Sequence, residues 1–133
     1  MTAISKREWR WGVVRAAAVV LVAALPYLIA WWTTPDDLFY TGFLTNPEDG
    51  HTYLAKMRQG QRGQWRFTLP YTAEPHKGEY TFLYYLALGQ LARAVGIDAP
   101  DALIWFWHIA RALNGLILLL TLYLTISYFF QDI

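Results

Sequence analysis

The fold is decided by residues 16–32, which read AAAVVLVAALPYLIAWW and contain no charged side chain. With the partly apolar residues 12–15 before it, this run reaches about 20 residues, enough for a helix to cross the hydrocarbon core of a bilayer. Pro26 would kink such a helix, which membrane helices tolerate. The sequence therefore predicts a transmembrane helix over residues 12–32. A cleaved signal peptide is the alternative interpretation of the same run.

A second apolar segment lies near the other end of the chain. Residues 113–130 contain no charged side chain. Residues 102–110 extend this apolar segment toward the N-terminus, and His108 and Arg111 interrupt it. We expect one long transmembrane helix over residues 102–130.

A weaker segment, residues 80–95, lies between these two. It is apolar for about a dozen residues, which is short for a crossing and favours an interfacial or re-entrant helix. A third crossing stays open as the alternative. The predicted fold class is thus an all-α integral membrane protein, one membrane region over residues 1–133 with two long transmembrane helices.

Composition and charge narrow the function classes. Hydrophobic residues make up 56% of the chain and aromatic residues 17%, both high for a soluble domain. The absence of cysteine excludes disulfides and thiolate metal sites, and a net charge of +1 gives no case for nucleic acid as a partner. The lipid bilayer is the expected partner, in a plasma or inner membrane.

The basic N-terminus sets the expected orientation. Lys6, Arg7, Arg10 and Arg15 precede the first apolar run, against Glu8 alone. Cytoplasmic flanks of membrane helices are enriched in such residues, so the N-terminus is predicted to be cytoplasmic. The loop of residues 33–79 is then extracytoplasmic.

The loop is predicted to contain one helix over residues 47–59. Asn46 is a suitable N-cap, Pro47 fits the first helical position, and Asp49 adds negative charge to the first turn. Gly60 is expected to end the helix.

Helical spacing places several polar residues of this helix together. Asp49, Tyr53, Lys56 and Gly60 share one face, and Leu54 with Met57 lies on another. We expect an amphipathic helix that lies on the membrane surface and turns its polar face toward an aqueous cleft.

Three carboxylates are candidates for a catalytic base, namely Asp49, Asp37 and Asp36. A carboxylate beside the membrane can take a proton from an acceptor hydroxyl. Each also has a structural interpretation, because Asp36 and Asp37 occupy a turn and Asp49 suits a helix N-terminus.

The candidate substrate-binding residues are Tyr53, Lys56, Arg58, Glu74, His76 and Arg111. Arginine and lysine in the loop can hold a phosphate, and Arg111 needs a partner because an isolated charge in an apolar helix is costly. A divalent cation is possible through His51, Glu74 or His76, but no metal site is predicted.

The order of these elements resembles a known family. A basic N-terminus and one crossing lead to a Tyr-Leu-Ala-Lys helix, then Gly-x-x-Gly-x-Trp, Glu-x-His, a half-length apolar helix, and Ala-Arg-Ala-Leu-Asn-Gly at the start of a long helix. This is similar to the N-terminal end of GT-C-type membrane glycosyltransferases, the group that includes protein mannosyltransferases and lipid A aminoarabinose transferases. The resemblance covers nearly the whole chain and about the first quarter of such an enzyme.

The resemblance implies a fold, a donor and a catalytic acid. Members of this group transfer a sugar from a polyprenyl-phosphate donor at the extracytoplasmic face, and their first loop carries an essential acidic residue. Asp49 is the best match to that residue, and Arg111 matches an arginine that often opens the second crossing. The family's adjacent Asp-Glu pair is absent, since residues 48–49 have the reverse order and residues 36–37 are Asp-Asp.

The chain is therefore expected to be the N-terminal part of a longer polytopic glycosyltransferase, inactive as 133 residues alone. The alternative is a small non-enzymatic membrane subunit or scaffold that packs with partner helices through Gly89 and Gly115.

Overall fold

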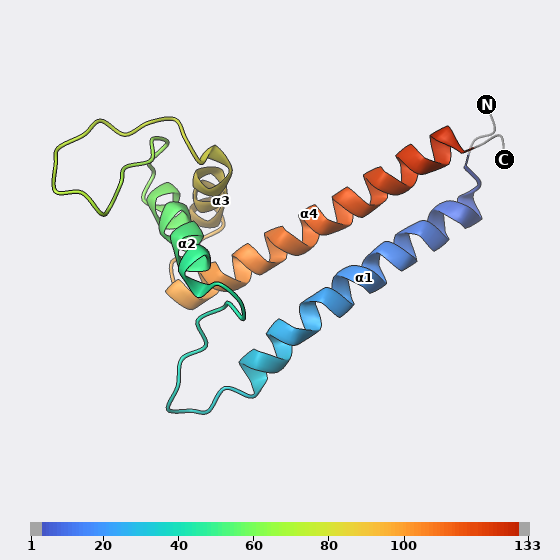
Figure 1. Ribbon diagram of the computed structural model, residues 1–133, viewed down its shortest axis with the longest axis horizontal. Coiled ribbons are helices and arrows are strands. Elements are labelled where there is room, and N and C mark those ends of the chain that lie inside the picture. The colour runs from blue at the N-terminus through green and yellow to red at the C-terminus, as the bar shows by residue number, and fades with distance from the viewer. Residues whose placement is uncertain (1–3, 131–133) are drawn as a thin grey trace. The chain divides into compact units, whose positions relative to one another are not determined.

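The computed structural model describes residues 4–130 and is all-helical over that range (Figure 1). Four helices follow one another along the chain, and the described residues form no strand beyond a single antiparallel bridge between Phe67 and Glu79. The predicted all-α class, with two helices long and apolar enough to span a membrane, is confirmed. The helices belong to two units, residues 4–34 with 109–130, and residues 35–108.

Helix α1, Lys6–Trp32, begins earlier than the predicted position 12 because a capping box precedes the apolar run. The Ser5 hydroxyl accepts from the backbone N–H of Glu8 at 3.2 Å, and the Glu8 carboxylate accepts from the backbone N–H of Ser5 at 2.8 Å. These two bonds satisfy free N–H groups of the first turn, so the basic residues are helical as well.

Helix α4, Pro100–Phe129, runs antiparallel to α1 in the part that belongs to the first unit. Gly12 contacts Tyr123, Val20 lies beside Gly115, and Tyr27 lies under Arg111. Later residues of α1 thus contact earlier residues of α4, as in an antiparallel pair.

The apolar surface of this pair faces outward. Ala16 is the one buried residue described in α1, and the buried residues of α4 all lie before position 109. A core helix of a soluble protein would bury its apolar side chains, whereas these expose Leu21, Val22, Ile117 and Leu118. So large an exposed apolar surface is costly in water and suits lipid or further helices.

The second unit packs two short helices, α2 (Pro47–Gln61) and α3 (Leu83–Ala94), side by side (Figure 1). Together with the first turns of α4 they enclose a small core of Leu54, Met57, Ala92, Leu103 and Ile104. The 12 residues of α3 rise only about 18 Å, less than the thickness of a hydrocarbon core. Among the described helices, α1 and α4 alone meet the requirements for a crossing.

Two glycines allow the close approach of α2 and α3. A Cβ on Gly60 would lie 2.1 Å from the carbonyl oxygen of Leu86, and one on Gly89 would lie 1.9 Å from that of Met57. The prediction that Gly60 ends the helix is wrong, because α2 continues to Gln61 and its C-cap is Arg62. Gly60 is needed for the contact between the helices.

The start of α2 also differs from the expectation. Pro47 takes the first turn as predicted, but Asn46 has φ 48° and ψ 58° and makes no side-chain cap bond. A capping side chain needs extended backbone at that position. Asn46 occupies the predicted N-cap position, but its amide donates to the Asp49 carboxylate in place of a bond between its side chain and the helix backbone, so Asp49 acquires a partner.

Candidate functional site

Four aromatic rings surround the ammonium group of Lys56. The side chain is 5% exposed, and its Nζ lies over rings from α2, from the 62–82 loop and from α3. The distances from Nζ to the ring centroids are 3.6 Å for Phe82, 5.2 Å for Tyr53, 5.6 Å for Tyr85 and 5.9 Å for Phe67. We refer to these four residues as the aromatic cage.

The cage changes the role expected of Lys56. Burial lowers the pKa of its ammonium, and the negative charge of Asp49 acts in the opposite direction. Cation–π attraction compensates part of the lost hydration, because it strengthens when the cation is removed from water. The expectation that Lys56 faces an aqueous cleft is therefore wrong, since this face of α2 packs against α3.

Tyr53 is held by the same packing. Its ring stacks on Tyr85 with centroids 4.7 Å apart and planes 6° from parallel. Burial raises the pKa of the Tyr85 phenol, and Tyr53 and Tyr84 add to the shift. Tyr53 is thus a structural neighbour of Lys56, and one face of its ring stacks on α3.

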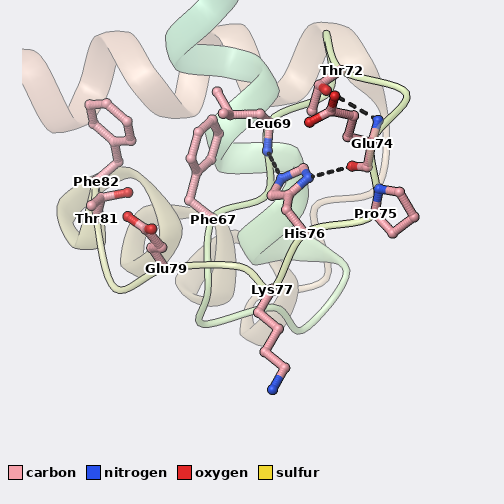
Figure 2. Close-up of a pocket in the computed structure, with 10 residues that line it drawn as sticks. All are labelled: Phe67, Leu69, Thr72, Glu74, Pro75, His76, Lys77, Glu79, Thr81 and Phe82. Atoms are coloured by element: carbon pink, nitrogen blue, oxygen red, sulfur yellow. Dashed lines mark hydrogen bonds between the residues drawn. The ribbon is translucent and has the colours of Figure 1, made fainter.

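A cavity of about 520 Å³ adjoins the cage (Figure 2). One chain segment supplies its lining, and the bridge between Phe67 and Glu79 closes that segment, with backbone N–H to O distances of 2.8 and 3.0 Å. The cage residues Phe67 and Phe82 are among its lining residues, so the cavity and the surroundings of Lys56 share these two rings. The remaining lining residues are Leu69, Thr72, Glu74, Pro75, His76, Lys77, Glu79 and Thr81.

His76 shapes this cavity. Its Nε2 accepts from the backbone N–H of Leu69 at 2.8 Å, and its Nδ1 donates to the carbonyl oxygen of Glu74 at 3.0 Å (Figure 2). A neutral imidazole has one donor and one acceptor, so both are used within the loop. His76 therefore ties residues 69, 74 and 76 of the loop together.

No metal centre is formed by the described residues. The ring centroid of His51 lies 5.6 Å from that of Phe43. Across residues 4–130, no three histidine or carboxylate side chains gather around a common point.

The three predicted catalytic carboxylates are all exposed, but their surroundings differ. Asp36 and Asp37 lie in the turn after α1, where the backbone N–H of Leu38 bonds the carbonyl of Pro35 at 3.0 Å. Asp49 lies on the first turn of α2, accepts from Asn46 and acts electrostatically on Lys56. It is the one carboxylate of the three with a described link to the cage.

The remaining predicted cations do not join the cage. Arg58 is exposed on α2. Arg111 belongs to the first unit, where its guanidinium carbon lies 3.9 Å from the centroid of the Tyr27 ring. The partner expected for Arg111 is thus an aromatic face on α1.

Sequence reasoning missed Phe67, Phe82 and Tyr85 as the surroundings of Lys56, and Glu79 as part of the cavity. The spacing of Tyr53 and Lys56 indicates a shared helix face, but it does not show what covers that face. This segment contains many aromatic residues, and the sequence does not indicate which of them contact Lys56.

Comparison with known proteins leaves the function to be argued from these features, since no family model, curated protein or solved structure matches the chain.

Proposed function

We propose that this chain is the N-terminal part of a membrane glycosyltransferase that transfers a sugar from a polyprenyl-phosphate donor to an acceptor at the extracytoplasmic face. The observation that carries the proposal is the environment of Asp49. It is an exposed carboxylate, fixed by Asn46 and coupled to a caged cation, in a polar unit whose flanking helices are long and apolar enough to span a membrane.

Asp49 is proposed as the general base of an inverting displacement. The acceptor oxygen forms a bond to the anomeric carbon, the bond from that carbon to the lipid phosphate breaks, and the hydroxyl proton passes to the carboxylate. The hydrogen bond from Asn46 limits the rotation of that carboxylate, which keeps one oxygen available to the acceptor.

The cavity beside the cage is proposed to hold the sugar. Aromatic rings pack against the C–H faces of a pyranose, and Phe67 with Phe82 supplies such a wall. Glu74 and Glu79 are acceptors for sugar hydroxyls. The role of Lys56 is then to hold these two rings in place, and exposed cations such as Arg58 are left to bind the phosphate.

Substitution in the natural full-length protein tests the base. Asp49→Asn keeps the size and the contact with Asn46 but removes the proton acceptor, and a loss of about 10²- to 10⁴-fold in transfer rate is expected. Asp36→Asn and Asp37→Asn are matched controls with the same chemistry in an unlinked turn. Transfer at the wild-type rate by Asp49→Asn, measured with a polyprenyl-phosphate sugar in native membranes, would eliminate Asp49 as the base.

A non-enzymatic subunit is the second candidate, and the exposed apolar surface of α1 and α4 favours it. Its predicted docking glycines have other roles, because Gly89 packs on α2 and a Cβ on Gly115 would lie 3.7 Å from Val20 of the same chain. Absence of glycosyl transfer from the natural full-length protein, together with a stable complex with another membrane protein, would favour this candidate.

A further inference from the structure

We propose that the N-terminal end of α1 binds the phosphate headgroup of an anionic phospholipid, through Arg7 and Arg15 with Trp11 between them and Tyr123 of α4 as the opposite wall. This site lies in the first unit, so it does not depend on the proposed glycosyltransferase activity.

The arginines are arranged on one helix face around an open cavity. Arg7, Trp11 and Arg15 follow at intervals of four residues, which places them above one another on α1. The cavity measures about 500 Å³ and is lined by these three residues together with Ser5, Glu8, Gly12 and Tyr123. A second cavity of about 520 Å³ adjoins it and shares Arg7 and Trp11, with Arg10 and Val14 as its other lining residues.

Tyr123 gives the site a wall from the second helix. Its ring lies where a side chain on Gly12 would be, with its Cε1 atom 2.9 Å from an ideal Cβ there. Trp9 adds a ring contact at a centroid distance of 6.3 Å. The cavity is therefore built from two helices of one unit, and the glycine makes room for the ring that closes it.

The charge of the site remains positive. Among the described residues that line it, Glu8 is the one acidic residue, and its carboxylate is bonded to the backbone N–H of Ser5 in the capping box. Two arginines, Arg7 and Arg15, line the cavity. Their planar forks bind phosphate oxygens in pairs, which a single lysine ammonium does not do.

The position of the site favours a lipid over a free phosphate. The uncharged run of α1 begins directly after Arg15, so acyl chains attached to a bound phosphate would cover its exposed side chains. Trp9 and Trp11 are 37% and 55% exposed, as expected of amphipathic rings at the level of the headgroups. Basic pockets between membrane helices are a known mode of anionic lipid recognition.

Native mass spectrometry of the full chain, released from nanodiscs of phosphatidylcholine with phosphatidylglycerol, tests the proposal. The wild type is expected to retain phosphatidylglycerol, and the double variant Arg7→Gln with Arg15→Gln is expected to lose roughly 30-fold of that preference. The control double variant Lys6→Gln with Arg93→Gln removes equal charge outside the cavity and is expected to stay within about twofold of the wild type. An equal loss in the control would overturn the proposal, because the attraction would then be diffuse.

Two further arms separate the remaining outcomes. The double variant Arg7→Lys with Arg15→Lys keeps the charge but loses the forks, so its preference is expected to lie between those of the glutamine variant and the wild type; a preference equal to that of the wild type would refute the paired guanidinium contacts. Inorganic phosphate is expected to leave the bound lipid in place. If it displaces phosphatidylglycerol at equal concentration, the site is one for soluble anions and the lipid assignment fails.

Discussion

Gly89→Ala is the sharpest test of the contact between α2 and α3. The added methyl carbon would lie 1.9 Å from the carbonyl oxygen of Met57 and 2.7 Å from the backbone nitrogen of Gln61. Ordinary contacts begin at 3.4 Å, so α3 must move away from α2 by about 1.5 Å. The neighbouring backbone cannot rotate away as a flexible side chain would.

The magnitude follows from what the movement separates. Met57 and Leu86 are fully buried at this contact, and a gap of 0.5–1 Å already removes roughly a quarter to a half of the attraction between two atoms. Overpacking of this kind costs about 1–3 kcal/mol or more, and the gain in helix propensity from glycine to alanine returns up to about 1 kcal/mol. We expect a net loss of about 2 kcal/mol, or roughly 30-fold faster opening.

Hydrogen exchange measured by mass spectrometry on the full chain in neutral detergent reads this opening directly. The peptides that cover residues 54–61 and 86–94 are expected to exchange faster in Gly89→Ala. Gly115→Ala is the matched control, since its methyl group would meet Val20 at 3.7 Å, and it is expected to leave those peptides unchanged. Wild-type exchange in a helical Gly89→Ala protein would refute the close approach of the two helices.

Three further predictions concern the cage and the loop. Burial lowers the pKa of Lys56, so between that lowered pKa and about pH 10.4 the unfolded chain binds more protons than the folded chain, and the free energy of unfolding should rise with pH. Lys56→Met should flatten this rise in urea titrations. The titrations are kept below about pH 10, because above it the raised pKa of Tyr85 makes the free energy of unfolding fall with pH. Phe82→Leu removes the nearest ring and should cost about 1–2 kcal/mol in the same titrations, whereas Phe39→Leu, at a ring that is 65% exposed, should change stability by less than about 0.5 kcal/mol. Gln59→Ala leaves a backbone N–H and a carbonyl of the loop without their side-chain partner and should cost about 1–3 kcal/mol, visible as faster exchange there; an unchanged rate would show that water replaces the amide.

The long helices could be predicted because their signal is local. A run of about 20 apolar residues is rare outside membrane helices, and no knowledge of its neighbours is needed to recognise it. The residues of the capping box, Ser5 and Glu8, are also visible in the sequence. The predicted start at position 12 follows the apolar pattern alone and therefore leaves out the first turns of the helix.

Most of the errors concern residues whose role depends on a partner distant in the sequence. Glycine at the end of a periodic pattern usually stops a helix, and Gly60 does not because Leu86 lies against it. Asn46 fits the composition of a cap, but its amide bonds Asp49. Lys56 was assigned to solvent by its charge, and rings far along the chain cover it. The contacts of Gly60 and Lys56 cannot be read from neighbouring residues, whereas the bond from Asn46 to Asp49 is local and competes with the cap.

The interlocked glycines also determine where this chain can change length. One residue inserted within α3 ahead of Gly89 would rotate the glycine by about 100°, bringing a side chain onto the α2 backbone. Insertions between Leu69 and Glu79 would leave both helices in register, because that stretch touches neither glycine. We therefore expect insertions to be tolerated in the loop that lines the cavity and to destabilise the packing of the two helices. The cavity can then vary in size while Lys56 stays in place.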